Sequence, residues 1–136
     1  MMNSLFVNIG SLFGIEGLTM QKILGWVFSP IMYLLSIPWD EAQAAGALFG
    51  EKLVLNEFVA FSHLTEYLSG MSEKTIVIVT FSLCGFANFG SIGIQLGGIG
   101  AMAPERKKDL SKLVMKEMIG GALASWLTAT IAGLII

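Results

Sequence analysis

Asn56 and Glu57 are an amide and an acid inside the otherwise apolar run Leu53-Val54-Leu55-Asn56-Glu57-Phe58-Val59-Ala60. A carboxylate deep in a bilayer costs about 2.5–3.5 kcal/mol on insertion scales, so it is retained where it faces a cavity, a partner or a substrate. An ionised carboxylate is also a strong acceptor of hydrogen bonds from hydroxyl groups. The run therefore predicts a polar site at membrane depth, centred on Glu57.

A second polar interruption lies in the uncharged segment 75–103, at Cys84-Gly85-Phe86-Ala87-Asn88-Phe89-Gly90-Ser91. Its glycines and polar residues predict an unwound or broken helix. Asn88 and Ser91 are three residues apart, so they share a face wherever the helix persists. Both side chains donate and accept hydrogen bonds, and together with Glu57 they could bind the vicinal hydroxyls of a sugar. Two interrupted elements with polar centres at one depth are typical of secondary transporters.

Structural alternatives exist for the polar residues. Glu57 could form an ion pair with Lys52, five residues earlier. Asn56 could cap the helix that follows it, a role as reasonable as ligand contact. Asn88 and Ser91 could make interhelical hydrogen bonds, which are typically worth about 0.6 kcal/mol in membranes.

Aromatic and reactive side chains add less. Phe86 could stack on a planar ligand, although an aromatic residue in a spanning helix usually faces lipid or core. His63 and Cys84 are each the single residue of their type, and we interpret both as structural. No nucleophile–base pair, metal cluster or phosphate loop is recognisable, so we do not expect an enzyme.

Composition indicates the class of protein. The chain has 136 residues, of which 54% are hydrophobic and 13% charged, and its mean hydropathy is +0.74. Soluble domains carry about 25% charged residues, so these values indicate a membrane protein. The net charge is −2 and the single basic cluster lies in one connection, which gives no reason to expect a nucleic acid as partner.

Helical elements must position the polar residues. We expect residues 1–38 to hold the end of a transmembrane helix and an interfacial helix; a spanning helix over 18–37, kinked at Pro30, is the alternative. Residues 39–68 predict a re-entrant helical hairpin, because about 10 residues at 1.5 Å each reach the midplane of a core about 30 Å thick. Asn56 and Glu57 would lie near its tip.

The second half predicts a broken transmembrane helix over 75–103, a cytoplasmic loop over 104–117 and a last transmembrane helix over 118–136. The loop holds five of the eight basic residues, which places it inside by the positive-inside rule and brings the hairpin in from outside. Small residues recur at helical spacing in the broken helix and should let another backbone approach closely: Gly90, Gly93, Gly97 and Gly100.

The two motifs resemble those of the concentrative nucleoside transporter family. The run Gly50-Glu51-Lys52-Leu53-Val54-Leu55-Asn56-Glu57-Phe58-Val59-Ala60 is similar to the family signature Gly-x-Lys-x-x-x-Asn-Glu-Phe-Val-Ala. Three further stretches match as well, so the resemblance covers nearly the whole chain: Gly85 to Gln95, Ile37-Pro38-Trp39, and Ala103-Pro104-Glu105-Arg106.

This resemblance implies an all-α membrane protein that is half of an inverted-repeat transporter, with a re-entrant hairpin and a discontinuous transmembrane helix. It implies a homotrimeric, multi-pass symporter of the plasma membrane, the inner membrane in bacteria, in which an elevator-like movement couples nucleoside uptake to Na+ or H+. By the same resemblance, Glu57, Asn88 and Ser91 contact the ribose and Phe86 lies beside the base. Asn56 completes the expected substrate-binding set.

The first half of the family pattern, with the opposite hairpin and the ligands of the coupling ion, has no counterpart in this sequence. We therefore expect a fragment or one product of a split gene, which needs a missing N-terminal half and uses no cofactor beyond the coupling ion. The alternative is a non-transporting membrane remnant or assembly subunit in which Glu57 is structural.

Overall fold

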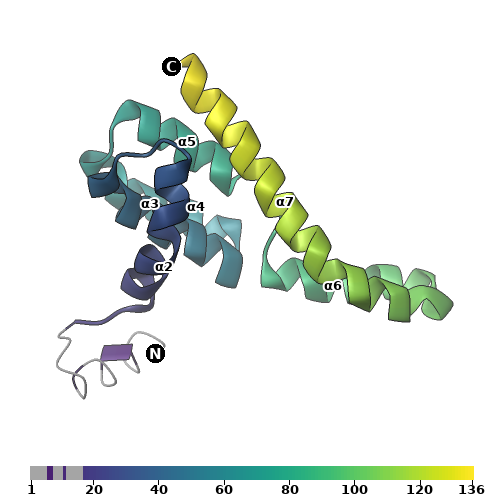
Figure 1. Cartoon of the computed structure of the whole chain (residues 1–136). Coiled ribbons are helices and arrows are strands. Elements are labelled where there is room, and N and C mark those ends of the chain that lie inside the picture. Colours follow the sequence, from purple (N-terminus) through teal and green to yellow (C-terminus); the bar gives the residue numbers. More distant parts are fainter. Residues whose placement is uncertain (1–5, 8–10, 12–16) are drawn as a thin grey trace.

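The computed structural model describes residues 6–7, 11 and 17–136, and the described residues form helices with no strand among them (Figure 1). The expected end of a transmembrane helix near the N-terminus falls mostly outside the described residues. Within residues 17–136, six longer helices are joined by short connections and two 3-10 turns: α2 (Met20–Leu34), α3 (Trp39–Val54), α4 (Glu57–Tyr67), η1 (Leu68–Gly70), α5 (Glu73–Leu83), α6 (Phe89–Met102), η2 (Pro104–Arg106) and α7 (Lys107–Ile135).

Helices α3 and α4 form the helical hairpin expected from the sequence. Asp40 and Glu41 lie in the first turn of α3, where negative charges interact favourably with the helix dipole. Helix α3 ends at Val54, Leu55 forms the connection, and Asn56 caps the start of α4. At the open end of the hairpin, Glu41 Oε2 accepts hydrogen bonds from the backbone N and the Oγ of Ser72, both 3.0 Å long. Because Ser72 caps α5, these bonds tie the start of the hairpin to the start of the broken helix.

Helix α2 turns sharply into α3, with an angle of 118° between them. Ser36 adopts a positive φ of 72° in the connection. Pro30 lies inside α2 and does not end the helix.

The α2–α3 crossing depends on glycines. A Cβ atom on Gly46 would lie 2.9 Å from both the carbonyl oxygen of Gly25 and the backbone nitrogen of Ser29. These neighbours are backbone atoms, which cannot rotate away. The two helices approach this closely only because position 46 has no side chain.

We expect Gly46→Ala to destabilise the chain by about 1–3 kcal/mol, the usual cost of overpacking, because α2 and α3 must separate. Thermal unfolding in detergent measures this change. Gly97→Ala is the matched control, because a Cβ there meets no atom of the described chain within 4 Å. A loss of stability equal to that of the control would contradict the close-approach explanation.

The core lies where α2, α3, α5 and α7 meet. Phe49 of α3 is almost fully buried, and its ring packs at 5.2 Å from Phe28 and at 5.0 Å from Trp126, measured between ring centroids. Fully or nearly fully buried aliphatic side chains complete it: Met32, Ile37, Leu48, Ile78, Val79 and Leu83.

Helix α7 contacts α6 along its N-terminal half and α5 along its C-terminal half (Figure 1). Residues 104–117 were predicted as a loop and the last helix from Met118, but α7 runs without interruption from Lys107 to Ile135. A helical turn or two was expected over Asp109 to Lys116, but the predicted start of the last helix was wrong. Lysines are good helix formers, so a charged stretch can extend a helix beyond the membrane. The stretch Pro104–Ile135 is the one described helix long and apolar enough to span a bilayer by itself; α2 and α3 would add a second if the bent pair counted as one span.

The glycine stripe of α6 makes no close backbone contact in the described chain. A Cβ on Gly93 or Gly97 would meet nothing within 4 Å, and the atoms nearest to one on Gly100 would belong to the Lys107 side chain. The expected approach of another backbone is therefore not made by the residues described.

Candidate substrate-binding site

The broken helix expected from the sequence is present, with α5 ending at Leu83 and α6 beginning at Phe89. Gly85, in the break, has a φ of +122°, a conformation that side-chain-bearing residues rarely adopt. Two side chains from other helices bind the carbonyl groups at the end of α5. Lys52 Nζ donates to the Ser82 carbonyl at 2.7 Å, and Ser125 Oγ donates to the Cys84 carbonyl at 2.9 Å.

The hairpin and the break meet through Glu57 and Asn88. Asn88 Nδ2 donates to Glu57 Oε2 at 2.9 Å, and the two residues are only 5% and 8% exposed, Asn88 being the more buried. Glu57 Oε1 accepts no hydrogen bond from the described chain, which leaves one carboxylate oxygen able to accept from a ligand.

Asn88 and Ser91 form a reciprocal cap at the start of α6. Asn88 Oδ1 accepts from the Ser91 backbone nitrogen at 2.8 Å, while Ser91 Oγ donates to the Asn88 carbonyl at 2.6 Å. The cap fixes the Asn88 side chain so that its amide points at Glu57. Asn88 thus combines a structural role, as the alternative interpretation required, with a place beside the carboxylate.

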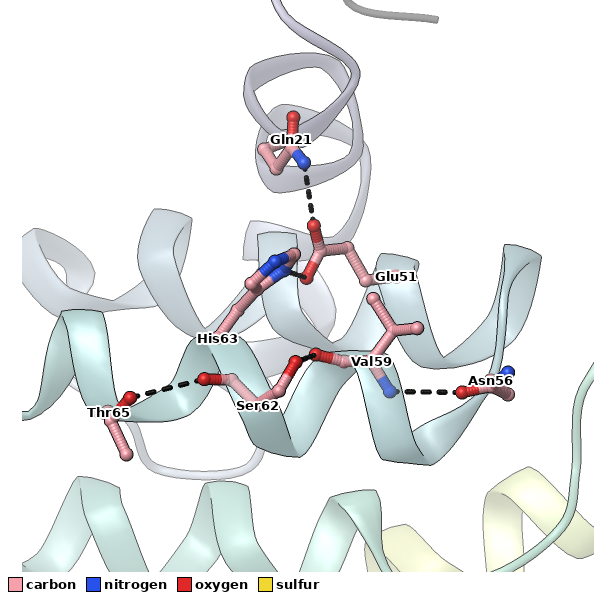
Figure 2. A network of polar contacts seen from close by, with 7 residues as sticks. All are labelled: Gln21, Glu51, Asn56, Val59, Ser62, His63 and Thr65. Carbon is pink, nitrogen blue, oxygen red and sulfur yellow. Dashed lines mark hydrogen bonds and ion pairs between the residues drawn. The ribbon is translucent and has the colours of Figure 1, made fainter.

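Asn56 caps α4 in the same way, because its Oδ1 accepts from the Val59 backbone nitrogen at 3.0 Å (Figure 2). Both asparagines therefore begin helices at the site, and each helix start carries backbone N–H groups and a partial positive charge. Such helix ends are the groups that transporters present to polar substrates near the midplane.

A cavity of about 470 Å³ lies against these groups, within the usual range for small-molecule sites. It brings together all five substrate-binding residues expected from the sequence. Phe86 is 72% exposed, so its ring is available for contact. The complete lining is Leu55, Asn56, Glu57, Phe58, Phe86, Asn88, Gly90, Ser91, Ile94 and Gln95.

The ion pair considered between Lys52 and Glu57 is not formed within the described chain. Lys52 is fully buried, with its ammonium group directed at α5 and 5.5 Å from the Phe49 ring centroid. It still lies near enough to Glu57 to interact electrostatically across the site. Its hydrogen bond to the Ser82 carbonyl fixes the end of α5 beside the hairpin, so Lys52 has a positioning role.

Three residues at the site were not anticipated. Lys52 is recognisable in the sequence as a cation inside a hydrophobic run, but the carbonyl group that accepts its hydrogen bond was not predictable. Nothing in the sequence distinguishes Ser125, because serines are common in spanning helices. Gln95 lines the cavity, and its Oε1 is buried with no hydrogen-bond partner in the described chain.

Comparisons with known proteins show what this chain is similar to. A family model described as "Na+ dependent nucleoside transporter C-terminus" matches residues 1–133. An uncharacterised transporter of Bacillus subtilis, YutK, is 51% identical over 92% of this chain and 31% of its own length. The nucleoside permease NupC of Helicobacter pylori is 42% identical over 89% of this chain and 30% of its own length.

Solved structures give the same result. This chain is 45% identical to the protein CNTnw in an inward-facing, substrate-bound state, with a TM-score of 0.93 over 97% of this chain and 33% of that one. A variant of the same protein in an outward-facing state gives a TM-score of 0.93 and 44% identity. The chain thus spans about a third of the length of these relatives.

Proposed function

Because the chain belongs to the family of Na+-dependent nucleoside transporters, we propose that it supplies the ribose-binding side of a nucleoside site in a larger ion-coupled transporter. The observation that carries the proposal is the Asn88–Glu57 contact at the wall of the cavity. It joins a charged acceptor on the hairpin to a helix start in the break.

In this proposal the ribose hydroxyls donate to Glu57. Its free Oε1 offers an acceptor that a hydroxyl can reach without displacing Asn88. Charge-assisted hydrogen bonds of this kind are about twice as strong as those between neutral groups. The Ser91 hydroxyl borders the same cavity and provides a second polar contact.

The exposed ring of Phe86 is proposed to lie beside the base, where its face can stack on a planar heterocycle. Asn56 contributes chiefly by capping α4 and so holding Glu57 at the start of that helix. The base-contacting polar groups and the Na+ or H+ ligands are proposed to belong to the other part of the transporter.

The complete protein is proposed to be a homotrimeric, multi-pass symporter of the bacterial inner membrane. Residues 1–38 would hold the end of a transmembrane helix and an interfacial helix, and 39–136 the substrate-binding half. The hairpin would enter from the outer face, with the basic start of α7 in the cytoplasm, as the positive-inside rule favours.

Isothermal calorimetry with uridine and with adenosine tests the proposal. The folded chain is measured alone in detergent and after co-expression with the N-terminal two thirds of a relative. We expect binding only in the joined sample, because one side of a cavity leaves the base unbound. A joined, folded sample that binds neither nucleoside would favour the alternative of a non-transporting subunit in which Glu57 is structural.

A further inference from the structure

The hairpin contains a second buried carboxylate, Glu51, which is only 1% exposed and lies outside the lining of the nucleoside cavity. Figure 2 shows two side chains converging on it. Gln21 Nε2 of α2 donates to Oε1 at 2.7 Å, and His63 Nδ1 of α4 lies 2.8 Å from Oε2. The carboxylate therefore connects three helices.

Within the described chain, His63 is the one residue that forms an ion pair with Glu51. Lys52, the neighbour of Glu51 in the sequence, is directed at the Ser82 carbonyl. With neutral His63, the site holds an uncompensated buried negative charge. With protonated His63, the pair is neutral overall, and a low-dielectric interior favours the neutral arrangement.

We propose that Glu51 and His63 together form a proton-binding site within the hairpin. In the loaded state both ring nitrogens carry protons, and Nδ1–H donates to Glu51 Oε2. The proton enters and leaves at Nε2, so no other bond forms or breaks. The His63 side chain is 37% exposed, which gives that nitrogen a route to water, while Glu51 stays enclosed.

Other ionisable groups surround the pair but do not replace either member. Glu66 on α4 is exposed and acts on His63 only through space. Tyr67 on α4 and Lys22 on α2 line a neighbouring cavity of about 380 Å³ with Gln21. Release of the proton should weaken the contact between α3 and α4, since a neutral imidazole binds a carboxylate less strongly than an imidazolium.

Nuclear magnetic resonance of the histidine ring nitrogens tests this site on the full chain in lipid nanodiscs. His63 is the single histidine, so one set of signals reports on it. We expect Glu51→Gln to move the titration midpoint of His63 toward acid by about one pH unit or more, a tenfold loss of proton affinity. Glu66→Gln, which removes an exposed acid three residues away, should move it much less.

Equal midpoints in the native chain and Glu51→Gln, or equal shifts in the two variants, would overturn the proposal. If Glu51→Gln does not fold, the native chain gives a second measurement. The side-chain amide signals of Gln21 should then shift with the same midpoint as His63, because the two share the carboxylate. Gln21 signals that stay constant while His63 titrates would also overturn it. Neither readout uses a nucleoside, so the test is independent of the proposed transport function.

Discussion

Glu57→Gln, introduced into the transporter that contains this chain, is expected to weaken nucleoside binding about tenfold to a hundredfold. A hydrogen bond to a charged acceptor contributes about 1.5–3 kcal/mol, and glutamine keeps the size but not the charge. In the native chain Asn88 Nδ2 donates to Glu57 Oε2 at 2.9 Å. The amide oxygen of glutamine can accept the same hydrogen bond, so the site should keep its shape. Calorimetry with uridine measures the affinity.

Expression level and elution volume should stay near those of the native protein, which separates lost binding from lost folding. The control is Glu66→Gln, a change of the same chemistry at an exposed position on the same helix. Unchanged nucleoside affinity in a well-folded Glu57→Gln protein would count against a ribose contact by this carboxylate.

Gly85→Ala, in the break between α5 and α6, is expected to destabilise the chain strongly. At a φ of +122° an alanine is strained by about 1–3 kcal/mol. Its Cβ would also lie 2.8 Å from Ser125 Oγ, which donates to the Cys84 carbonyl. Moving that hydroxyl leaves the carbonyl without its donor, so the steric and hydrogen-bond costs add to the strain.

Thermal unfolding in detergent measures this loss, with Gly93→Ala on α6 as the control because a Cβ there meets no described atom within 4 Å. The double variant Gly85→Ala/Ser125→Ala should recover only part of the stability, since it removes the steric conflict but leaves both the backbone strain and the Cys84 carbonyl without its donor. A native melting temperature for Gly85→Ala would show that the break does not need a positive φ.

The hairpin tip and the broken helix were predictable because their signals are local. An acid beside an amide in an apolar run, and glycines beside an asparagine in an uncharged segment, each mark an interruption without reference to the rest of the chain. The same residues then proved to line one cavity, as their common depth had suggested.

Contacts between distant residues could not be read in this way. Ser125 meets Cys84 across 41 positions, and His63 meets Glu51 across a turn whose geometry decides which side chains face each other. His63 was interpreted as structural because a single histidine carries no pattern. The start of α7 was misplaced because polarity marks the edge of the membrane, whereas the helix continues through it.

The buried ionisable groups of the hairpin also constrain how the protein is made. Glu51, Lys52 and Glu57 are each at most 8% exposed, yet each charge costs about 2.5–3.5 kcal/mol at the centre of a lone inserting helix. The acceptor of Lys52 lies on α5, and the donor to Glu57 at the start of α6, so both partners are synthesised after the hairpin. We therefore expect the hairpin to enter the bilayer only after α5 and the start of α6 have been synthesised.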